Sequence, residues 1–263
     1  MDLDRRLSVA VLAAKAGGAV LKEYFETSID HEEKEDRTFV TEADKRSEEV
    51  ISGILKREYP DDDILGEESG RKDRKGEYLW VIDPLDGTAN FMNAIPIFAV
   101  SLALMKGEDI LVAAVYNPVT DSLFSAKKGG GAFWNEKALR VSGETTKNVI
   151  VTFGKSSKKE DAAGVNALFV AYQAYGFRVR HLGSAALELA YLARGGTEGF
   201  VNLGTKLWDY AGGALLVLEA GGKLTDLSGG PWTPSEHFFV ASNGKIHATL
   251  LEETTKLGQN SRT

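Results

Sequence analysis

Four short apolar runs follow one another between residues 98 and 134, and the connectors between them are brief. The runs are Phe98–Met105, Ile110–Tyr116, Ser122–Ala126 and Ala132–Trp134. A parallel pair of strands needs a crossover of roughly a dozen residues or more, usually a helix, which a connector such as Lys106-Gly107-Glu108-Asp109 cannot supply. The spacing therefore predicts an antiparallel sheet in this part of the chain.

Helical periodicity precedes this sheet. Apolar and small residues recur at steps of three and four over Leu7–Phe25, and a second helix is predicted over Glu42–Glu58. The charged stretch His31–Arg37 between them is expected to form an exposed loop or edge. Tyr78–Asp83, which is apolar except at its end, is typical of a buried strand.

Beyond a polar, aperiodic stretch at Ser142–Lys147, predicted strands and helices alternate. The strands are Val149–Phe153, Arg178–Arg180, Gly199–Val201, Lys223–Asp226 and Phe238–Ala241, and the helices are Asp161–Tyr175, Ala185–Ala193, Asp209–Ala220 and Lys245–Glu253. We therefore predict an α/β protein with alternating α-β-α-β-α layers, in which an antiparallel N-terminal sheet packs beside a mixed C-terminal one. The predicted domains are residues 1–145, of α+β type, and residues 146–263, of α/β type.

The amino-acid composition excludes several classes of site and argues against others. The 263-residue chain has no cysteine, which excludes disulfides, thiolate zinc sites, iron–sulfur clusters and cysteine nucleophiles. Its net charge of −7 at pH 7 argues against binding to a nucleic-acid backbone, which needs a basic surface. The longest apolar run, Ile95–Met105, is shorter than the roughly 20 residues that cross a bilayer. We expect a cytoplasmic protein without nucleic-acid or membrane partners.

The most informative segment is Leu79–Asn90, with the sequence LWVIDPLDGTAN. A buried strand delivers Asp83, Pro84 cannot donate to the ladder, and Asp86-Gly87-Thr88 is typical of the opening of a short helix. Free N–H groups at such an opening suit a phosphate, and a glycine allows its close approach. One turn thus offers two carboxylates and an anion site. From this segment alone a structural interpretation stays open, in which the two acids cap a helix and close a turn.

Two nucleophile-based mechanisms are disfavoured. Phosphatases that form an aspartyl-phosphate also contain Asp-Gly-Thr, but their nucleophile lies two residues before that aspartate, where this chain has Pro84. The histidines lie outside the motifs; they are His31, His181, His237 and His247. His181, beside Leu182-Gly183-Ser184, is expected to be structural or to contact substrate. We therefore expect direct attack by water.

Two further acidic segments have both a structural and a chemical interpretation. Glu67 and Glu68 follow a predicted strand at Ile64–Leu65, so they are either a solvated pair or side chains at the same sheet edge as Asp83. The charged stretch Arg71–Glu77 would then act as a mobile flap. Asp209 begins an otherwise apolar helix, where it is either an N-cap or a metal ligand at the helix tip.

Asp44 follows Thr41 by three residues, which is similar to a capping box with Asp in place of Glu. On this segment alone, the structural interpretation of Asp44 is favoured.

Taken together, these motifs resemble those of a known enzyme family. Val81–Thr88 resembles the signature of the inositol monophosphatase family of lithium-sensitive, magnesium-dependent phosphatases. Gly66-Glu67-Glu68-Ser69 and Trp208-Asp209, followed by Ala211-Gly212, are similar to its other two acidic motifs, in the same order. Leu182–Ala186 is similar to a loop on the substrate side. The matching motifs span residues 39–222.

The resemblance implies a set of ligands for two or three Mg²⁺ ions. Glu67, Asp83 and the backbone carbonyl of Leu85 would hold the first ion. Asp83, Asp86 and Asp209 would hold the second, and Glu67 would hold a looser third. The residue chemistry agrees, since carboxylates about 4 Å apart repel by about 4 kcal/mol at an effective dielectric near 20, and an all-oxygen cluster selects a hard cation.

The resemblance also implies how water and substrate are held. Thr88, with Asp44 or Glu67, would position the attacking water, and the amides of Gly87 and Thr88 would hold the phosphate. Substrate contacts are expected from Asp86, Gly87, Thr88, Gly183, Ser184, Ala185, Asn202 and Asp209.

The implied substrate is myo-inositol monophosphate or a related small sugar or polyol phosphate. Asn202 departs from the pattern of inositol-selective members, which usually have Glu six residues before the tryptophan of the Trp-Asp motif. Conversely, members that act on fructose 1,6-bisphosphate often lack this tryptophan, which is present here as Trp208. The two features point to different substrates. Alternative substrates are fructose 1,6-bisphosphate, histidinol phosphate and 3′-phosphoadenosine 5′-phosphate. Arg178, Arg180 and Lys206 are candidates for contact with a second phosphate.

An alternative from another class is a protein that binds a phosphorylated ligand and acts through a partner. The family resemblance further implies a homodimer and inhibition by Li⁺.

Overall fold

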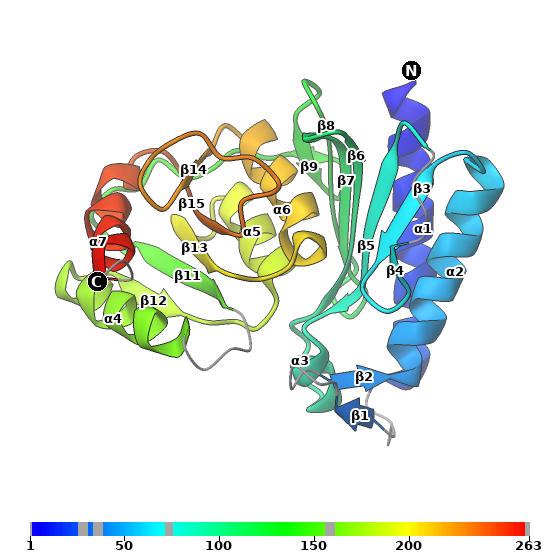
Figure 1. Ribbon diagram of the computed structural model, residues 1–263, viewed down its shortest axis with the longest axis horizontal. Coiled ribbons are helices and arrows are strands. Elements are labelled where there is room, and N and C mark those ends of the chain that lie inside the picture. The colour runs from blue at the N-terminus through cyan, green and yellow to red at the C-terminus, as the bar shows by residue number, and fades with distance from the viewer. Residues whose placement is uncertain (1, 26–30, 34–38, 72–75, 156–160, 261–263) are drawn as a thin grey trace.

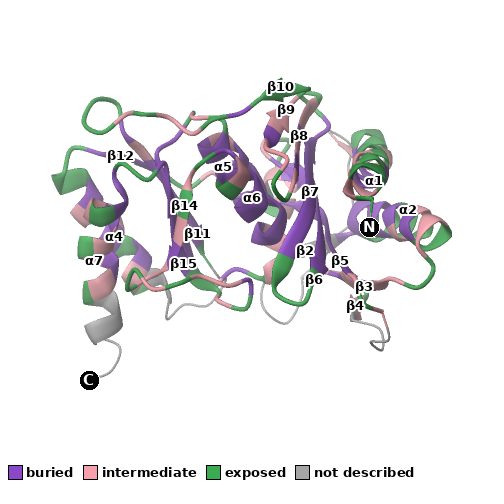
Figure 2. Ribbon diagram, turned by 90° about the horizontal axis from the view of Figure 1, so that it is seen from above, coloured by how far each residue is buried: buried purple, intermediate pink, exposed green. Residues whose placement is uncertain are grey.

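The structure, a computed structural model, describes residues 2–25, 31–33, 39–71, 76–155 and 161–260. Helices and sheets alternate in five layers, seen side by side in Figure 1 and from above in Figure 2. The layers are a helix pair, an eight-stranded sheet, a second helix pair, a five-stranded sheet and a third helix pair. The predicted fold class is confirmed.

The first layer consists of α1 (Leu3–Tyr24) and α2 (Glu42–Glu58), as the periodicity predicted. The helices approach closely because α1 has glycine where they meet: a Cβ built on Gly17 would lie 2.6 Å from Cδ1 of Ile51. For the stretch predicted as an exposed loop or edge, the edge alternative agrees with the structure over β1 (His31–Glu33), a strand that pairs with β2 (Phe39–Thr41). The rest of that stretch and most of the predicted flap at 71–77 lie outside the described residues.

The large sheet has the strand order β10-β9-β8-β7-β6-β5-β3-β4. Its strands are β3 (Asp63–Gly66), β4 (Gly70–Arg71), β5 (Leu79–Asp86), β6 (Ala99–Lys106), β7 (Asp109–Asn117), β8 (Ser122–Lys127), β9 (Ala132–Trp134) and β10 (Lys137–Ala138). From β5 to β10 the pairing is antiparallel, as predicted. The prediction of a wholly antiparallel sheet is wrong at one pair, because β3 runs parallel to β5.

The second sheet has the order β12-β11-β13-β15-β14 and is mixed, as predicted. Its strands are β11 (Ile150–Lys155), β12 (Arg178–Arg180), β13 (Gly199–Leu203), β14 (Lys223–Asp226) and β15 (Phe238–Ser242). Its outer face is covered by α4 (Asp161–Ala174) and α7 (His247–Asn260). A short helix, α3 (Thr88–Met92), follows β5.

The central helices α5 (Ala185–Ala193) and α6 (Leu207–Glu219) pack against both sheets. One hydrophobic cluster joins them to side chains of the large sheet, such as Phe124, and of the second sheet, such as Phe200. The two helices are in close contact, since a Cβ built on Gly213 would lie 2.5 Å from Cβ of Leu189. Because these helices pack against both sheets, one hydrophobic core crosses the predicted boundary after residue 145. The division into two domains therefore stays a prediction.

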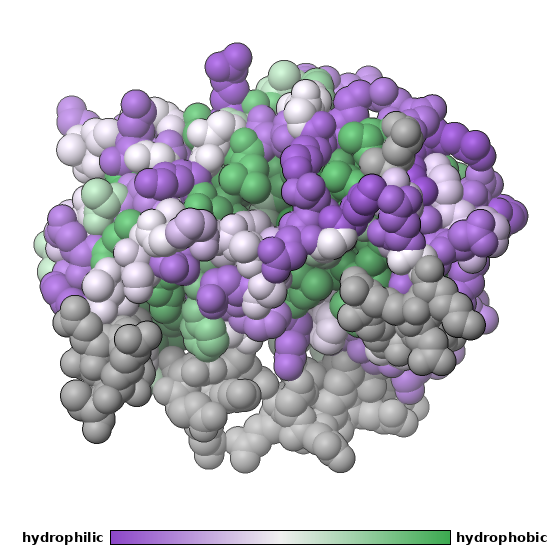
Figure 3. All heavy atoms as spheres, turned by 45° about the horizontal axis from the view of Figure 1, so that its top comes forward, coloured by the Kyte–Doolittle hydropathy of each residue, from purple (hydrophilic) through white to green (hydrophobic). Residues whose placement is uncertain are grey.

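Apolar side chains on the surface are scattered over different elements. Large exposed ones include Leu12 on α1, Val170 on α4 and Leu218 on α6. On the face seen in Figure 3, small apolar areas alternate with hydrophilic side chains. None of the helices in the described part of the chain combines the length and the hydropathy that a bilayer-spanning segment requires.

The buried His247 predicts how stability depends on pH. Its Nδ1 contacts Oγ of Ser242 at 2.8 Å and its Nε2 contacts Oγ1 of Thr225 at 2.9 Å. Burial, and then the charge of Lys223, lowers its pKa from 6.5 to about 4. The unfolded chain therefore takes up the proton first, so we expect full stability above about pH 6.5 and a loss of up to about 3 kcal/mol as the pH falls towards 4.

Urea unfolding of the wild type and of His247→Gln between pH 7.5 and pH 4 would check this. The variant should lose that part of the pH dependence, and identical slopes for the two proteins would contradict the assignment.

Candidate metal-dependent active site

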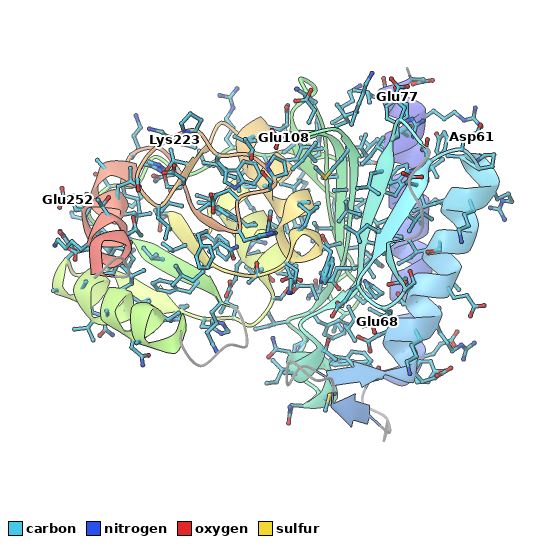
Figure 4. All side chains as sticks on the ribbon, in the orientation of Figure 1. Asp61, Glu68, Glu77, Glu108, Lys223 and Glu252 are labelled. Atoms are coloured by element: carbon cyan, nitrogen blue, oxygen red, sulfur yellow. The ribbon has the colours of Figure 1, made fainter. Side chains whose placement is uncertain are left out.

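The parallel pairing of β3 with β5 brings the first two acidic motifs together. In this register Gly66 lies beside Ile82, so the next residues along each strand, Glu67 and Asp83, leave the sheet at the same edge. The backbone N–H of Glu67 also donates to the carbonyl of Ile82 at 3.1 Å. Figure 4 shows Glu68 at this end of the sheet, whereas Glu77 and Glu108 lie at the opposite end.

A bulge in β5 turns two aspartates towards one site. Asp83 pairs with Ser101 and Asp86 with Ala99, so three steps on β5 oppose two on β6. The predicted end of the strand at Pro84 is thus a bulge, which a residue without an N–H tolerates. Residues three apart in a regular strand point to opposite faces, and the extra residue removes that difference.

Asp209, near the start of α6 (Leu207–Glu219), completes this cluster. One carboxylate oxygen each from Asp83, Asp86 and Asp209 lie within 4.8 Å of one another. Asp209 is the third residue of α6, and its Oδ2 accepts from the backbone N–H of Lys206 at 2.7 Å. The prediction that α6 begins at Asp209 is therefore wrong, since the helix begins at Leu207 with Lys206 as its N-cap.

Burial and mutual repulsion make these acids hard to ionise together. Burial raises the pKa of Asp83, and the charges of Glu67, Asp86 and Asp209 raise it further. Burial also raises the pKa of Asp209, followed by the charges of Asp86 and Glu67. Burial is the largest cause of the raised pKa of Asp86 as well, although hydrogen bonds from Ser184 and Ala186 oppose it.

The donor set fits a hard divalent cation. All three clustered side chains offer carboxylate oxygens, and Glu67 and Leu85 line the same cavity. Asp83 holds its position by accepting from the N–H of Leu85 at 2.9 Å through Oδ1. Buried carboxylates this close together are stable as anions when a cation is bound between them, and oxygen-only sites with few protein ligands suit Mg²⁺.

The cluster lines a cavity of about 340 Å³. Its lining includes most of the residues that the resemblance marks: Glu67, Asp83, Leu85, Asp86, Gly87, Thr88, Gly183, Ser184, Ala185 and Asp209. Gly87 is the N-cap of α3, with φ +100°, so the predicted short helix after Asp86 is present. The hydroxyl of Thr88 donates to the carbonyl of Leu85 at 3.1 Å.

Ser184 ties the substrate-side loop to the metal cluster. It is the N-cap of α5, and its hydroxyl donates to Oδ2 of Asp86 at 2.5 Å. The backbone N–H of Ala186 donates to the same oxygen at 2.8 Å. Asp86 is therefore held by α5 as well as by its own strand.

Asp44 lies in the predicted capping box and outside the cavity lining. Its Oδ2 accepts from the backbone N–H of Thr41 at 2.9 Å and from the Thr41 hydroxyl at 2.5 Å. Its Oδ1 is buried and has no hydrogen-bond partner among the described residues. Burial raises the pKa of Asp44 to about 7, against the hydrogen bonds from Thr41.

Asn202 does not reach the cavity, contrary to the expected substrate contact. Its side chain is fully buried, donating to the carbonyl of His237 at 2.8 Å and accepting from the hydroxyl of Thr205 at 2.8 Å. Thr205 lines the cavity and Asn202 supports it from behind. Both polar ends of Asn202 are used within the protein.

The basic residues predicted to meet a second phosphate are also placed elsewhere. Arg178, Arg180 and Lys206 are not among the residues that line the cavity, and Nη1 of Arg180 donates to the carbonyl of Val179 at 2.8 Å. Lys155, at the end of β11, lines it instead and lies close enough to His181 for its charge, after burial, to lower the pKa of that histidine. The sequence motifs contain no signal for Lys155.

Two other polar residues near the site were not predicted. Glu188 is buried on α5, lines the cavity and accepts from the N–H of Leu182, and burial raises its pKa well above the usual value. Asn90 donates through Nδ2 to the carbonyls of Ile97 and Leu182, each at 2.7 Å. In the sequence, these residues are marked only by their neighbours: Asn90 ends the segment Leu79–Asn90, and Glu188 follows Leu182–Ala186.

Comparison with known proteins gives one consistent family. Residues 2–259 match the profile of the inositol monophosphatase family. The chain is 38% identical over 260 residues to a fructose-1,6-bisphosphatase/inositol-1-monophosphatase of Aquifex aeolicus, covering 97% of each protein. It is 37% identical to the Nus factor SuhB of Escherichia coli K12, covering 93% of this chain and 94% of that one.

A solved structure of an inositol monophosphatase from Anabaena superimposes with a TM-score of 0.87 at 36% identity, covering 97% of each chain. The similarity therefore extends over nearly the whole chain, in sequence and in fold.

Proposed function

The chain belongs to the inositol monophosphatase family of phosphoric monoester hydrolases, and we propose that it hydrolyses a small sugar or polyol phosphate with Mg²⁺. The first candidate substrate is myo-inositol monophosphate. The observation that carries the proposal is the convergence of carboxylate oxygens of Asp83, Asp86 and Asp209 within 4.8 Å of one another in the lining of a cavity. Gly87 and Thr88, the predicted phosphate donors, line the same cavity.

Each part of the site has a proposed role. Glu67, Asp83, Asp86, Asp209 and the Leu85 carbonyl would hold two or three Mg²⁺ ions. When bound, Mg²⁺ supplies charge neutralisation and lowers the pKa of a water ligand. The chain itself contributes alignment of the phosphate and of the attacking water.

Polar side chains beside the metal site would position the water. Thr88 is held against the carbonyl of Leu85, which keeps its hydroxyl within the cavity wall. The buried Oδ1 of Asp44, which has no partner among the described residues, supports a role for this acid in holding a water molecule. Gly183, Ser184 and Ala185 would meet the alcohol part of the substrate.

Phosphate release from a panel of substrates, measured with and without Mg²⁺, tests the proposal. The panel contains myo-inositol 1-phosphate, fructose 1,6-bisphosphate, histidinol phosphate and 3′-phosphoadenosine 5′-phosphate. We expect turnover only with Mg²⁺ and the highest kcat/KM with inositol phosphate. Phosphate release that is equal with Mg²⁺ and with EDTA would overturn the metal assignment, and a higher kcat/KM for another member would reassign the substrate.

Lys155 favours a bisphosphate as the second candidate. It is the only lysine or arginine among the described residues that line the cavity, and the Aquifex relative carries both enzyme names. Its ammonium could bind a second phosphate group. A hydrogen bond to a charged group contributes about 1.5–3 kcal/mol, so Lys155→Met is expected to lower kcat/KM for fructose 1,6-bisphosphate by about 10- to 100-fold.

Inositol phosphate should lose much less in the same variant, because it has no second phosphate. Lys155→Arg should retain most of the activity on the bisphosphate, and Lys137→Met, at an exposed position on β10, is the matched control outside the cavity. Equal losses for both substrates in Lys155→Met would contradict this role.

A role exerted through a partner is the candidate from a different class. This candidate is favoured by one observation, namely that a relative with 37% identity is named Nus factor SuhB. Retention of all four predicted acidic ligands supports catalysis instead. A pure binding protein would show no Mg²⁺-dependent turnover on any member of the panel.

From family membership we also infer inhibition by Li⁺, a homodimer and a cytoplasmic location. A Li⁺ titration of the turnover and light scattering of the protein in solution would check the first two.

A further inference from the structure

Glu48, a buried acid on α2, lies directly behind the turn that carries Glu67. It is 4% exposed and does not line the active-site cavity. Its Oε2 accepts from the backbone N–H of Glu68 at 2.9 Å, and its Oε1 accepts from the N–H of Ser69 at 2.9 Å. Both oxygens of one carboxylate are therefore used by consecutive amides of the turn that follows β3. Such charge-assisted pairs are stronger than neutral hydrogen bonds.

Gly66 makes room for this contact. A Cβ built at Gly66 would lie 2.5 Å from the carboxyl carbon and from both carboxyl oxygens of Glu48, closer than real atoms approach. The φ of Gly66 is not in the left-handed region, so space rather than backbone conformation requires glycine here. Gly66 and Glu48 thus form one close contact between β3 and α2.

The same helix also contacts the second ligand-bearing turn. Ser47, the residue before Glu48, donates through Oγ to the carbonyl of Pro84 at 3.2 Å, inside the bulge between Asp83 and Asp86. Neighbouring side chains on α2 therefore touch both turns from which predicted metal ligands project. The turns are fixed to one rigid element as well as to each other.

The carboxylate of Glu48 has an electrostatic cost and a hydrogen-bonding advantage at this position. Glu67 and Glu68 are acids on the same turn, so a third acid behind it adds repulsion that a neutral side chain would avoid. Only a carboxylate, however, can accept from both N–H groups, since a glutamine would present an NH₂ group to one of them.

We propose that Glu48 is a positioning residue, which sets the turn of Glu67 so that its carboxylate reaches the Asp83 cluster. This inference rests on the proposed metal site. Groups that orient metal ligands typically alter affinity by about 10- to 100-fold when they are removed. Glu48 acts through Glu67 and does not contact the substrate.

Mg²⁺ binding of Glu48→Gln, measured by calorimetry alongside phosphate release, tests this. We expect the dissociation constant for Mg²⁺ and the Mg²⁺ concentration for half-maximal turnover to rise about tenfold or more. Gly66→Ala should have the same effect, because its methyl group would displace the Glu48 carboxylate. Glu49→Gln, at an exposed position on the same helix, is the matched control and should leave both values unchanged.

Thermal unfolding in EDTA separates positioning from a purely structural role. A lower Tm for Glu48→Gln with unchanged Mg²⁺ affinity would overturn the proposal. A wild-type protein that binds no Mg²⁺ and shows no Mg²⁺-dependent turnover would instead overturn the proposed function itself. If Gly66→Ala fails to fold, the milder Glu48→Gln variant still decides the question.

Discussion

Asp83→Asn is expected to abolish Mg²⁺-dependent turnover while leaving the fold intact. Asp83 is the acid shared by both predicted ion sites; it is 1% exposed and lines the cavity. Loss of several kcal/mol of charge stabilisation would lower kcat/KM by about a thousandfold or more. The hydrogen bond from the N–H of Leu85 to Oδ1 can be retained by the asparagine carbonyl, so the bulge should persist.

The stability of the same variant without Mg²⁺ should not fall below that of the wild type. Burial and the charges of Glu67, Asp86 and Asp209 already disfavour an ionised Asp83, so a neutral amide removes repulsion. In EDTA the urea midpoint should therefore equal or exceed that of the wild type. Added Mg²⁺ should raise the midpoint of the wild type and have little effect on the variant.

Asp109→Asn is the matched control for this experiment. Asp109 lies at the exposed start of β7, with its Oδ1 2.6 Å from Nζ of Lys128. Exposed ion pairs contribute only about 0–1 kcal/mol, so activity and stability should both be close to wild type. Near-normal activity of Asp83→Asn would refute the metal assignment.

Gly87→Ala is expected to have the second largest effect, on activity and stability together. Gly87 has φ +100° and ψ 36° as the N-cap of α3, a region that costs an L-residue about 1–2 kcal/mol. Its new Cβ would lie 2.9 Å from the carbonyl oxygen of Ile97 and 3.1 Å from that of Gly183. The methyl group would force α3 and the Gly183 loop apart, and both of these segments line the cavity.

Loss of one preorganised amide donor lowers turnover by about 100- to 1000-fold in other hydrolases, which sets the expected scale. Gly107→Ala separates strain from site geometry, since Gly107 has φ +59° in the turn after β6 and nothing lies within 4 Å of its built Cβ. Turnover and urea unfolding of both variants would check this. We expect Gly107→Ala to lose some stability and keep its activity; equal activity in the two variants would count against the role of Gly87.

Much of the architecture was accessible from local patterns. The spacing of apolar residues predicted α1, α2 and the antiparallel strands β6 to β9, because each period matches one regular element. The cavity lining was largely predicted too, since Asp83, Gly87 and Asp209 belong to short motifs with specific spacing. These features depend on residues that are close together in the chain.

Contacts between distant segments were not accessible in this way. Lys155 lines the cavity from the end of β11, whereas Asn202 is outside the lining and forms hydrogen bonds with His237 and Thr205. Glu48 lies twenty residues before the amide of Glu68 to which it binds. The spacing of residues along the sequence does not predict such long-range contacts, because they form only when α2, β3 and the second sheet pack together.

The sequence alone predicted a layered α/β chain, the four acids Glu67, Asp83, Asp86 and Asp209 as metal ligands, and a glycine-bearing turn beside them. Their convergence required the assembled molecule. The parallel β3–β5 pair places Glu67 and Asp83 at one sheet edge, and an antiparallel pair would have placed them at opposite edges. The bulge after Asp83 and the packing of α6 against the large sheet then bring Asp86 and Asp209 to the same site. Strand direction and helix packing are set by burial of side chains from the whole chain, which no single motif encodes.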